Sequence, residues 1–383
     1  MLNFDFYNPT RIAFGEGKVA ELDKLVPKDA RVLILLGGNS ARKNGTLAEV
    51  LDALGSRTVT EFDGIEPNPQ YDTLMKAVAL IKAEKIDYLL AVGGGSVIDG
   101  TKFIAAAVYQ EGDPWNILLK KGANIKQALP YGTVLTLPAT GSEMNNGSVI
   151  SRGLDKLYFT NEHVFPQFSV LDPTKSYTLP ARQLANGVVD AFTHTMEQYL
   201  TYPVGAEVQD RFSEGLLSTL IKVGPRVLAN PRDYNAQANL MWTASLALNG
   251  LICSGVPEDW ATHMLGHEIT AAHGLDHAQT LAIILPTMLQ VRRESKHTKL
   301  LQYAARVWNI TEGDEESRID AAIAKTRTFF ESLGVKTKLS EYKITQDAID
   351  NLLKQLEAHG MVALGEHKDV TLDVSRKVLE ASI

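Results

Sequence analysis

Apolar runs that end in glycine predict buried parallel strands in the first half of the chain. The run within Arg31–Leu36 is closed by two glycines, and Tyr88–Val92 leads into three. Thr133–Leu137 is a third run, halted by Pro138. Strands that are apolar at nearly every position are typical of a parallel sheet covered on both faces.

Helical patterns separate these runs. Apolar residues near helical spacing predict helices over 41–54 and 69–84, with a short strand over 59–62 between them. Alternating strands and helices imply right-handed βαβ units. We therefore expect a Rossmann-like, doubly wound α/β domain over residues 1–180.

Beyond about residue 180 the pattern becomes helical and β-branched runs are scarce. This predicts an α-helical second domain over 181–383, and a chain of 383 residues is long enough for two cores. The expected helices cover 181–200, 206–222, 234–250, 258–272, 278–294, 298–309, 315–333 and 345–358.

Composition narrows the possible functions. The net charge of -7 gives no general electrostatic reason to bind nucleic acid or an anionic membrane. No apolar run is long enough to span a bilayer, and residues 1–6 lack the pattern of a secretory signal. With Cys253 as the one cysteine, we expect a cytoplasmic protein without internal disulfides.

Small and polar residues follow three predicted strands, at 37–40, 93–96 and 140–142. Ligands of parallel sheets bind beyond the carboxyl ends of the strands, where glycine lets a pyrophosphate approach the backbone. Each segment alone could be a tight turn without a ligand, but three together favour a nucleotide. The G-x-G-x-x-G fingerprint is absent, so the site is not an ordinary Rossmann site.

The first of these turns bears on cofactor choice. Gly37, Gly38, Asn39 and Ser40 include no acid, whereas an NAD site normally places a carboxylate near the ribose 2′-hydroxyl. We therefore expect NADP(H). The cations that follow, at positions 42 and 43, could equally form a solvated helix face.

Histidines are concentrated late in the chain, at His263, His267, His273 and His277. Asp190 and His194 are spaced i,i+4, as are His263 and His267, so each pair projects from one helix face. Two such pairs could supply the converging N and O donors of a divalent metal site. Any one of these histidines could instead be a core or capping residue, and donor type does not choose among Fe(II), Zn(II), Mn(II) and Ni(II).

The combined motifs resemble the iron-containing (group III) alcohol dehydrogenase family, and within it the NADPH-dependent butanol dehydrogenase or broad-range aldehyde reductase subgroup. They occupy 93–99, 138–143, 186–194, 263–267 and 273–277. The resemblance implies a dinucleotide-binding α/β domain, a helical catalytic domain and a homodimer.

The resemblance also implies roles for individual residues. The metal ligands, for one Fe(II) or Zn(II) ion, would be Asp190, His194, His263 and His277. His267 would lie outside this set, near the nicotinamide, as the catalytic residue for proton relay or cofactor positioning. The remaining cofactor contacts would be Gly94, Gly95, Ser96, Asp99, Thr136, Thr140, Ser142 and Lys156.

The implied reaction is hydride transfer between NADP(H) and a short-chain primary alcohol or aldehyde such as butanol or butanal. An NAD-dependent glycerol-type dehydrogenase and a non-redox lyase like dehydroquinate synthase are the alternatives. No cluster of basic residues accompanies the histidines to hold the phosphorylated substrate of the lyase. Trp260, Met264 and Leu265 could form an apolar substrate wall or part of the core.

Overall fold

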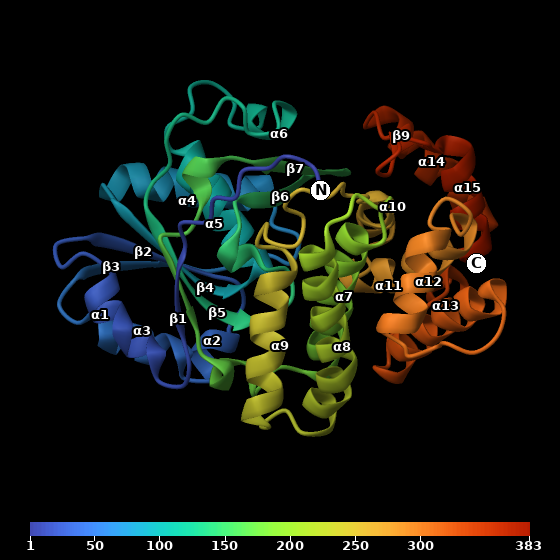
Figure 1. Ribbon diagram of the computed structural model, residues 1–383. Helices are drawn as coiled ribbons and strands as arrows, with labels where there is room; N and C mark the ends of the chain where they lie inside the picture. Colours follow the sequence, from blue (N-terminus) through green and yellow to red (C-terminus); the bar gives the residue numbers. More distant parts are fainter. The chain divides into compact units, whose positions relative to one another are not determined.

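The computed structural model describes residues 1–383 and contains two compact units (Figure 1). The α/β unit comprises Tyr7–Leu179 and Pro231–Ser245, and the helical unit comprises Met1–Phe6, Pro180–Asn230 and Leu246–Ile383. A division into domains at residue 180 stays a prediction.

The α/β unit is built on a six-stranded sheet in which every neighbouring pair is parallel. Its strand order is β1-β8-β5-β4-β2-β3. This arrangement confirms the predicted parallel α/β fold. The strands are β1 (Arg11–Phe14), β2 (Arg31–Leu36), β3 (Thr58–Phe62), β4 (Tyr88–Gly94), β5 (Tyr131–Leu137) and β8 (Phe168–Leu171).

Both faces of this sheet are covered by helices, which explains its continuous apolar runs. In β2, Leu33 and Leu35 enter one hydrophobic core together with α4 (Tyr71–Glu84) and α5 (Gly95–Ala107). The alternate residues of β2 enter a second core with α1 (Leu22–Leu25) and α3 (Thr46–Leu54) (Figure 1). Each fully buried aliphatic side chain contributes about 1.5–3 kcal/mol to folding.

Some expected elements differ in detail. The single helix predicted over 41–54 is two, α2 (Ser40–Lys43) and α3, because Gly45 between them has a φ of 84°. The pattern also missed β1, β8, the short helix α6 (Asn116–Leu119) and an antiparallel hairpin. This hairpin joins β6 (Gly147–Arg152) to β7 (Asp155–Thr160).

The helical unit has helices in the regions where the sequence predicts them, with shifted ends, and one further helix over Leu372–Ala381 that was not predicted. The helix predicted to end at 222 continues through Pro225 to Ala229, since Val223 and Val227 remain buried. A two-stranded ladder, β9 (Ala363–Leu364) with β10 (Val370–Thr371), accompanies the helices. The helices are α7 (Ala181–Tyr199), α8 (Glu207–Ala229), α10 (Ala261–His273), α11 (His277–Val291), α12 (His297–Arg306), α13 (Glu315–Ser332), α14 (Ile349–Ala358) and α15 (Leu372–Ala381), while α9 (Tyr234–Ala247) falls mostly in the α/β unit.

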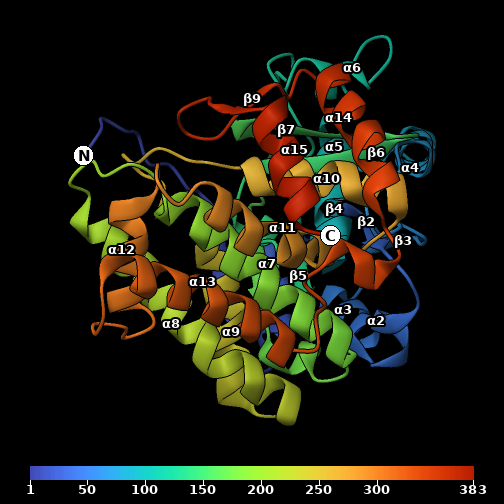
Figure 2. The same cartoon turned by 90° about the vertical axis from the view of Figure 1, so that its right-hand side faces the viewer.

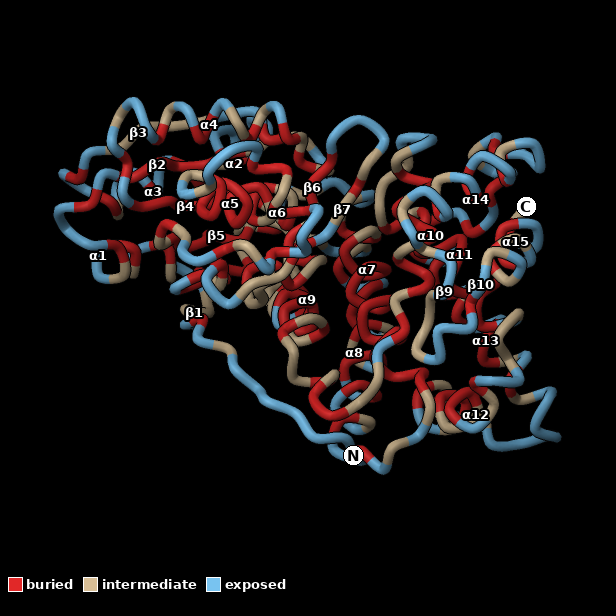
Figure 3. Tube along the Cα trace, turned by 90° about the horizontal axis from the view of Figure 1, so that it is seen from above, coloured by how far each residue is buried: buried red, intermediate tan, exposed pale blue.

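Helix α7 lies at the centre of the helical unit. It packs against α8 and α11, and α11 packs against α10 (Figure 2). From Leu184 onward α7 is buried at almost every position, as the red trace in Figure 3 shows. None of the helices is both long enough and apolar enough to cross a membrane.

Candidate metal centre and dinucleotide site

The buried helix α7 carries ionisable side chains in an apolar setting. Asp190 and His194 are 3% and 4% exposed and lie one turn apart. A buried carboxylate is costly unless it is paired, hydrogen-bonded or bound to a cation. Core packing therefore does not explain why Asp190 and His194 are buried on α7.

Three imidazole nitrogens surround one oxygen of Asp190. Its Oδ1 lies 3.5 Å from Nε2 of His194, 3.9 Å from Nε2 of His263 and 3.8 Å from Nε2 of His277. Donor atoms of Asp190, His263 and His277 all lie within 4.8 Å of one another. The structure thus brings Asp190, His263 and His277 into one compact donor group. His194 is not in that group, but its Nε2 faces Oδ1 of Asp190.

The ends of two helices place the later histidines. His277 is the first residue of α11, fixed by a capping box in which Asp276 and Gln279 bond each other's backbone. His263 lies in the first turn of α10, after Trp260 in a left-handed conformation with a φ of 62°. The Trp260 ring lies edge-on, 5.2 Å from the ring of His263.

The chemistry of this donor set fits a divalent metal. Burial lowers the pKa of His194 to about 4, although the charge of Asp190 opposes this effect, so the imidazole is neutral near pH 7. Neutral imidazole and carboxylate are the donors that Fe(II) and Zn(II) accept in proteins. The residues present therefore fit the metal that the sequence predicts.

The two other clustered histidines have different surroundings. His267 is buried on α10, and its ring centroid lies 5.1 Å from that of His277 and 6.4 Å from that of His263. It lies beside the donor cluster but outside the compact group of Asp190, His263 and His277. His273 is exposed at the end of α10, and burial of its ring is only partial.

Sequence reasoning missed Glu197, the nearest partner of the cluster. One of its carboxylate oxygens, Oε2, contacts Nδ1 of His263, and the other accepts the backbone N–H of Thr262 at 2.7 Å. Burial raises the pKa of Glu197, and the buried ammonium of Lys296 opposes that rise. Its spacing, seven residues after Asp190 and three after His194, is the signal that could have identified it.

The three glycine-containing turns follow neighbouring strands. Since β2 pairs with β4 and β4 with β5 in parallel, their carboxyl ends form one edge of the sheet. A Cβ atom on Gly95 would lie 2.3 Å from Oγ1 of Thr140, so only glycine permits this approach of two turns. The edge has the geometry expected of a ligand site in a parallel sheet.

Asp99 lies under these turns in a hydrogen-bonded network. Its carboxylate accepts from the Ser142 hydroxyl at 2.5 Å and from the Val149 N–H at 2.9 Å. Burial raises the pKa of Asp99, while the charges of Lys102 and Lys156 oppose that rise. Asp99 and Ser142, both expected to contact the cofactor, thus bond each other.

Lys102 is the second residue that sequence reasoning missed. Fully buried on α5, it donates from Nζ to the Ser142 hydroxyl at 2.8 Å, Asn145 Oδ1 at 2.7 Å and the Gly147 carbonyl at 2.7 Å. Burial lowers its pKa to about 8, against the attraction of Asp99. The ammonium ties α5 to the turn after β5.

The other residues expected to contact the cofactor also belong to the α/β unit. Lys156 on β7 is buried, not on the surface, and Thr140 Oγ1 accepts the N–H of Ser142 at 3.2 Å. Thr136 is partly buried near the end of β5, and Gly94 and Ser96 flank Gly95 at the start of α5.

The turn at residues 37–40 contains no acid and is largely exposed. Gly38 has open space where a side chain would lie, whereas Gly37 packs near Val97 of α5. Arg42 forms ion pairs with Glu61 at 2.5 Å and with Asp63 at 2.6 Å. Its charge is therefore already paired within the protein.

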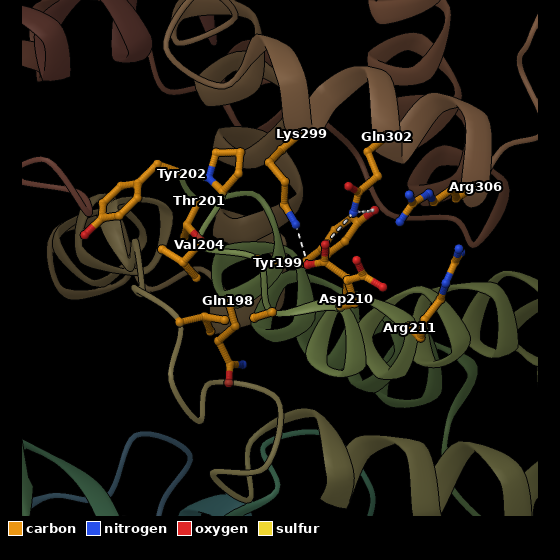
Figure 4. A pocket seen from close by; sticks show the side chains of 15 residues that line it. Gln198, Tyr199, Thr201, Tyr202, Val204, Asp210, Arg211, Lys299, Gln302 and Arg306 are labelled. Carbon is orange, nitrogen blue, oxygen red and sulfur yellow. Dashed lines mark hydrogen bonds and ion pairs between the residues drawn. The ribbon is translucent and has the colours of Figure 1, made fainter. Parts of the chain in front are cut away.

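A separate pocket of about 280 Å³ lies beyond the end of α7 (Figure 4). The side chains of Tyr199, Lys299 and Gln302 line it, and Lys299 forms an ion pair with Asp210. None of the four donor residues lines this pocket.

Comparisons with known proteins match nearly the whole chain to one family. The sequence model of the iron-containing alcohol dehydrogenases matches residues 9–173, and that of the C-terminal part of the same family matches 184–378. The NADPH-dependent aldehyde reductase YqhD of Escherichia coli is 62% identical, over 100% of both chains. A probable NADH-dependent butanol dehydrogenase of Bacillus subtilis is 39% identical, also over 100% of both.

A solved structure gives the same result. The crystal structure of Escherichia coli YqhD matches with a TM-score of 0.99 and 60% identity, covering 100% of this chain and 99% of that one. These findings confirm the resemblance read from the motifs. The chain belongs to the iron-containing alcohol dehydrogenase family.

Proposed function

We propose that the protein is an NADP(H)-dependent alcohol dehydrogenase and aldehyde reductase acting on short-chain primary alcohols or aldehydes, such as butanol and butanal. It would use one divalent metal ion, Fe(II) or Zn(II). The observation that carries this proposal is the approach of three imidazole Nε2 atoms to Oδ1 of Asp190, at 3.5–3.9 Å. The 62% identity to an NADPH-dependent aldehyde reductase supports the substrate class and the cofactor.

The four ligand residues would hold the metal, which would supply Lewis-acid polarisation of the substrate oxygen when bound. With a divalent cation bound, one carboxylate and three neutral imidazoles would leave the site with a net positive charge. His267 lies one turn after His263 on α10, and it relays a proton or positions the nicotinamide. The cofactor supplies the hydride, and the protein supplies orientation and charge.

The sheet edge of the α/β unit holds the dinucleotide. Gly94, Gly95 and Ser96 give the pyrophosphate access to the backbone N–H groups that begin α5. Thr136, Thr140 and Lys156 supply further contacts. Asp99 and Ser142 act mainly by bracing the turns, since each already bonds the other.

NADH is the second candidate cofactor, because a relative with 39% identity is named as NADH-dependent. The acid-free turn at 37–40 favours NADPH, since a 2′-phosphate there meets no carboxylate of the turn. We therefore expect the protein to use NADPH in preference to NADH.

The test follows absorbance at the nicotinamide band with butanal, with NADPH or NADH, and with added Zn(II) or Fe(II). The proposal expects metal-dependent oxidation of NADPH, faster than that of NADH, and no turnover for His263→Ala. Faster turnover with NADH would overturn the cofactor assignment. Full activity in metal-free protein would overturn the metal site.

We also propose that the protein is a cytoplasmic homodimer, and that each chain has two domains with the predicted bounds 1–180 and 181–383. The single cysteine supports the compartment, and the dimer rests on what is usual in the subgroup. Light scattering of the purified protein would test the dimer.

A further inference from the structure

Glu197 connects the start of α10 to α7. Its Oε1 accepts the N–H of Thr262 at 2.7 Å, and its backbone carbonyl accepts the N–H of Asp259 at 3.0 Å. The first N–H groups of a helix have no partner inside the helix, so the Glu197 carboxylate caps α10 from a neighbouring element. These contacts give Glu197 a structural role at the start of α10.

The second carboxylate oxygen of Glu197 contacts a histidine of the donor cluster. Oε2 contacts Nδ1 of His263, whose Nε2 faces Oδ1 of Asp190 at 3.9 Å. When Nε2 of His263 binds a cation, the remaining proton of the ring is on Nδ1, and the ionised carboxylate of Glu197 accepts it. The Thr262 N–H and the charge of Lys296 favour that ionised form against the effect of burial. The tautomer with its proton on Nδ1 is the one in which Nε2 can bind a cation.

The orientation of His263 also affects His194. The two rings are stacked, with centroids 4.7 Å apart and an angle of 13° between their planes. Nδ1 of His194 is buried and has no hydrogen-bond partner. The His194 ring is therefore oriented by its place on α7 and by the ring of His263, not by a carboxylate of its own.

Behind Glu197 the charges are already paired. Lys296, which is 3% exposed, donates to Asp259 Oδ2 at 2.7 Å, to Glu366 Oε1 at 2.8 Å and to the Leu200 carbonyl at 2.6 Å. This fixed network leaves Oε2 of Glu197 directed at His263.

We propose that Glu197 is a positioning residue that holds His263 in its metal-binding tautomer and thereby sets the affinity of the site for metal. The inference rests on the proposed ligand set of Asp190, His194, His263 and His277. It goes beyond that set by assigning part of the metal affinity to a side chain that does not touch the metal.

Glu197→Gln separates the two roles of this residue. Its amide has one acceptor oxygen and one NH₂ donor. If the oxygen continues to accept from Thr262, the NH₂ faces Nδ1 of His263 and forces the proton onto Nε2. The cap of α10 is then kept while the metal-binding tautomer is lost.

The measurement is the Zn(II) dissociation constant of the full chain, by competition with a chromophoric chelator, alongside the melting temperature of the metal-free protein. We expect the constant of Glu197→Gln to rise about 10- to 100-fold, with little change in metal-free melting temperature. The Co(II)-substituted protein should also change its visible spectrum. Glu214→Gln is the matched control, because Glu214 is buried but bonds Tyr199, Arg211 and Gln302 instead of a histidine.

Two results would overturn the inference. A lower melting temperature with an unchanged Zn(II) constant would leave Glu197 as a helix cap only. A wild-type chain that binds no Zn(II) or Co(II) would refute the ligand set itself. Metal binding by wild type therefore distinguishes failure of the ligand set from failure of the positioning role of Glu197. If Glu197→Gln does not fold, Glu197→Ala decides: it removes the acceptor for Nδ1 of His263, and a Zn(II) affinity equal to wild type would contradict the positioning role.

Discussion

The Oδ1 atom of Asp190 lies 3.5 Å from Nε2 of His194, one turn further along the buried helix α7. This i,i+4 relationship places both donors on one face before any other helix contributes. The helix therefore provides half of the ligand set by its own geometry, and α10 and α11 only complete it.

His194→Ala should consequently remove metal and turnover together. Loss of a direct ligand should weaken Zn(II) binding by more than about 100-fold. Mutation of a residue that only hydrogen-bonds a ligand already lowers metal affinity about 10- to 100-fold. Metal content after dialysis and the rate with NADPH and butanal test this. His273→Ala, an exposed histidine at the end of α10, should keep both, and retained zinc in His194→Ala would contradict the site.

His267→Asn should separate chemistry from metal binding. Zn(II) affinity should stay within a few-fold of wild type, while kcat falls about 10²- to 10⁴-fold if His267 moves a proton. The pH profile of kcat/KM should also lose one limb. If zinc is lost along with activity, His267 belongs to the ligand set instead.

The donor spacing along α7 and α10 is why the metal site was predictable from sequence. Side chains one turn apart must share a face, whatever surrounds the helix. The same rule could not exclude His267, which is also one turn from His263. Only the family resemblance separated them.

Glu197 and Lys102 were not predictable in the same way. A glutamate or lysine within a helix is usually solvated, and their burial depends on what packs over them. Glu197 acquires its role from the start of α10, 65 residues later in sequence. Lys102 acquires its role from the turn at Ser142–Gly147.

The fold shows the same difference between local and tertiary signals. The strands β2 and β4 are buried and apolar over most of their length, so they can be predicted directly from the sequence. The edge strand β1 is short and partly exposed, with a burial pattern that gives no periodic signal. The break between α2 and α3 depends on the backbone of Gly45, whose φ is set only in the folded chain.

Asn39→Asp should shift the cofactor preference toward NADH. A carboxylate in the exposed turn at 37–40 would repel a 2′-phosphate and accept from a 2′-hydroxyl. We expect the ratio of kcat/KM for NADPH to that for NADH to fall about 10-fold, equal to about 1.4 kcal/mol. The effect should weaken at high salt, because the turn is exposed.

Asn351→Asp adds the same charge to an exposed position of α14 and should leave the ratio unchanged. An unchanged ratio in Asn39→Asp as well would mean that this turn does not face the 2′ position.

Lys102 should make stability depend on pH in a defined window. Its pKa in the folded chain is about 8, below the ordinary value of 10.5. Between these values the unfolded chain binds more protons, so the Lys102 contribution to stability rises with pH there and is constant below about pH 8. From pH 7 to 10.5, the unfolding free energy of wild type should gain about 3 kcal/mol relative to Lys102→Met.

Urea unfolding at both pH values gives the unfolding free energy of wild type and of Lys102→Met. The gain is the change with pH in the difference between the two proteins, and the titration of groups that they share cancels in it. Lys24→Met, which removes a lysine from the surface, corrects for the loss of one amine. A difference between wild type and Lys102→Met that is the same at both pH values would show that the buried ammonium keeps its ordinary pKa. The hydrogen bonds to Ser142, Asn145 and Gly147 would then fully compensate for its burial.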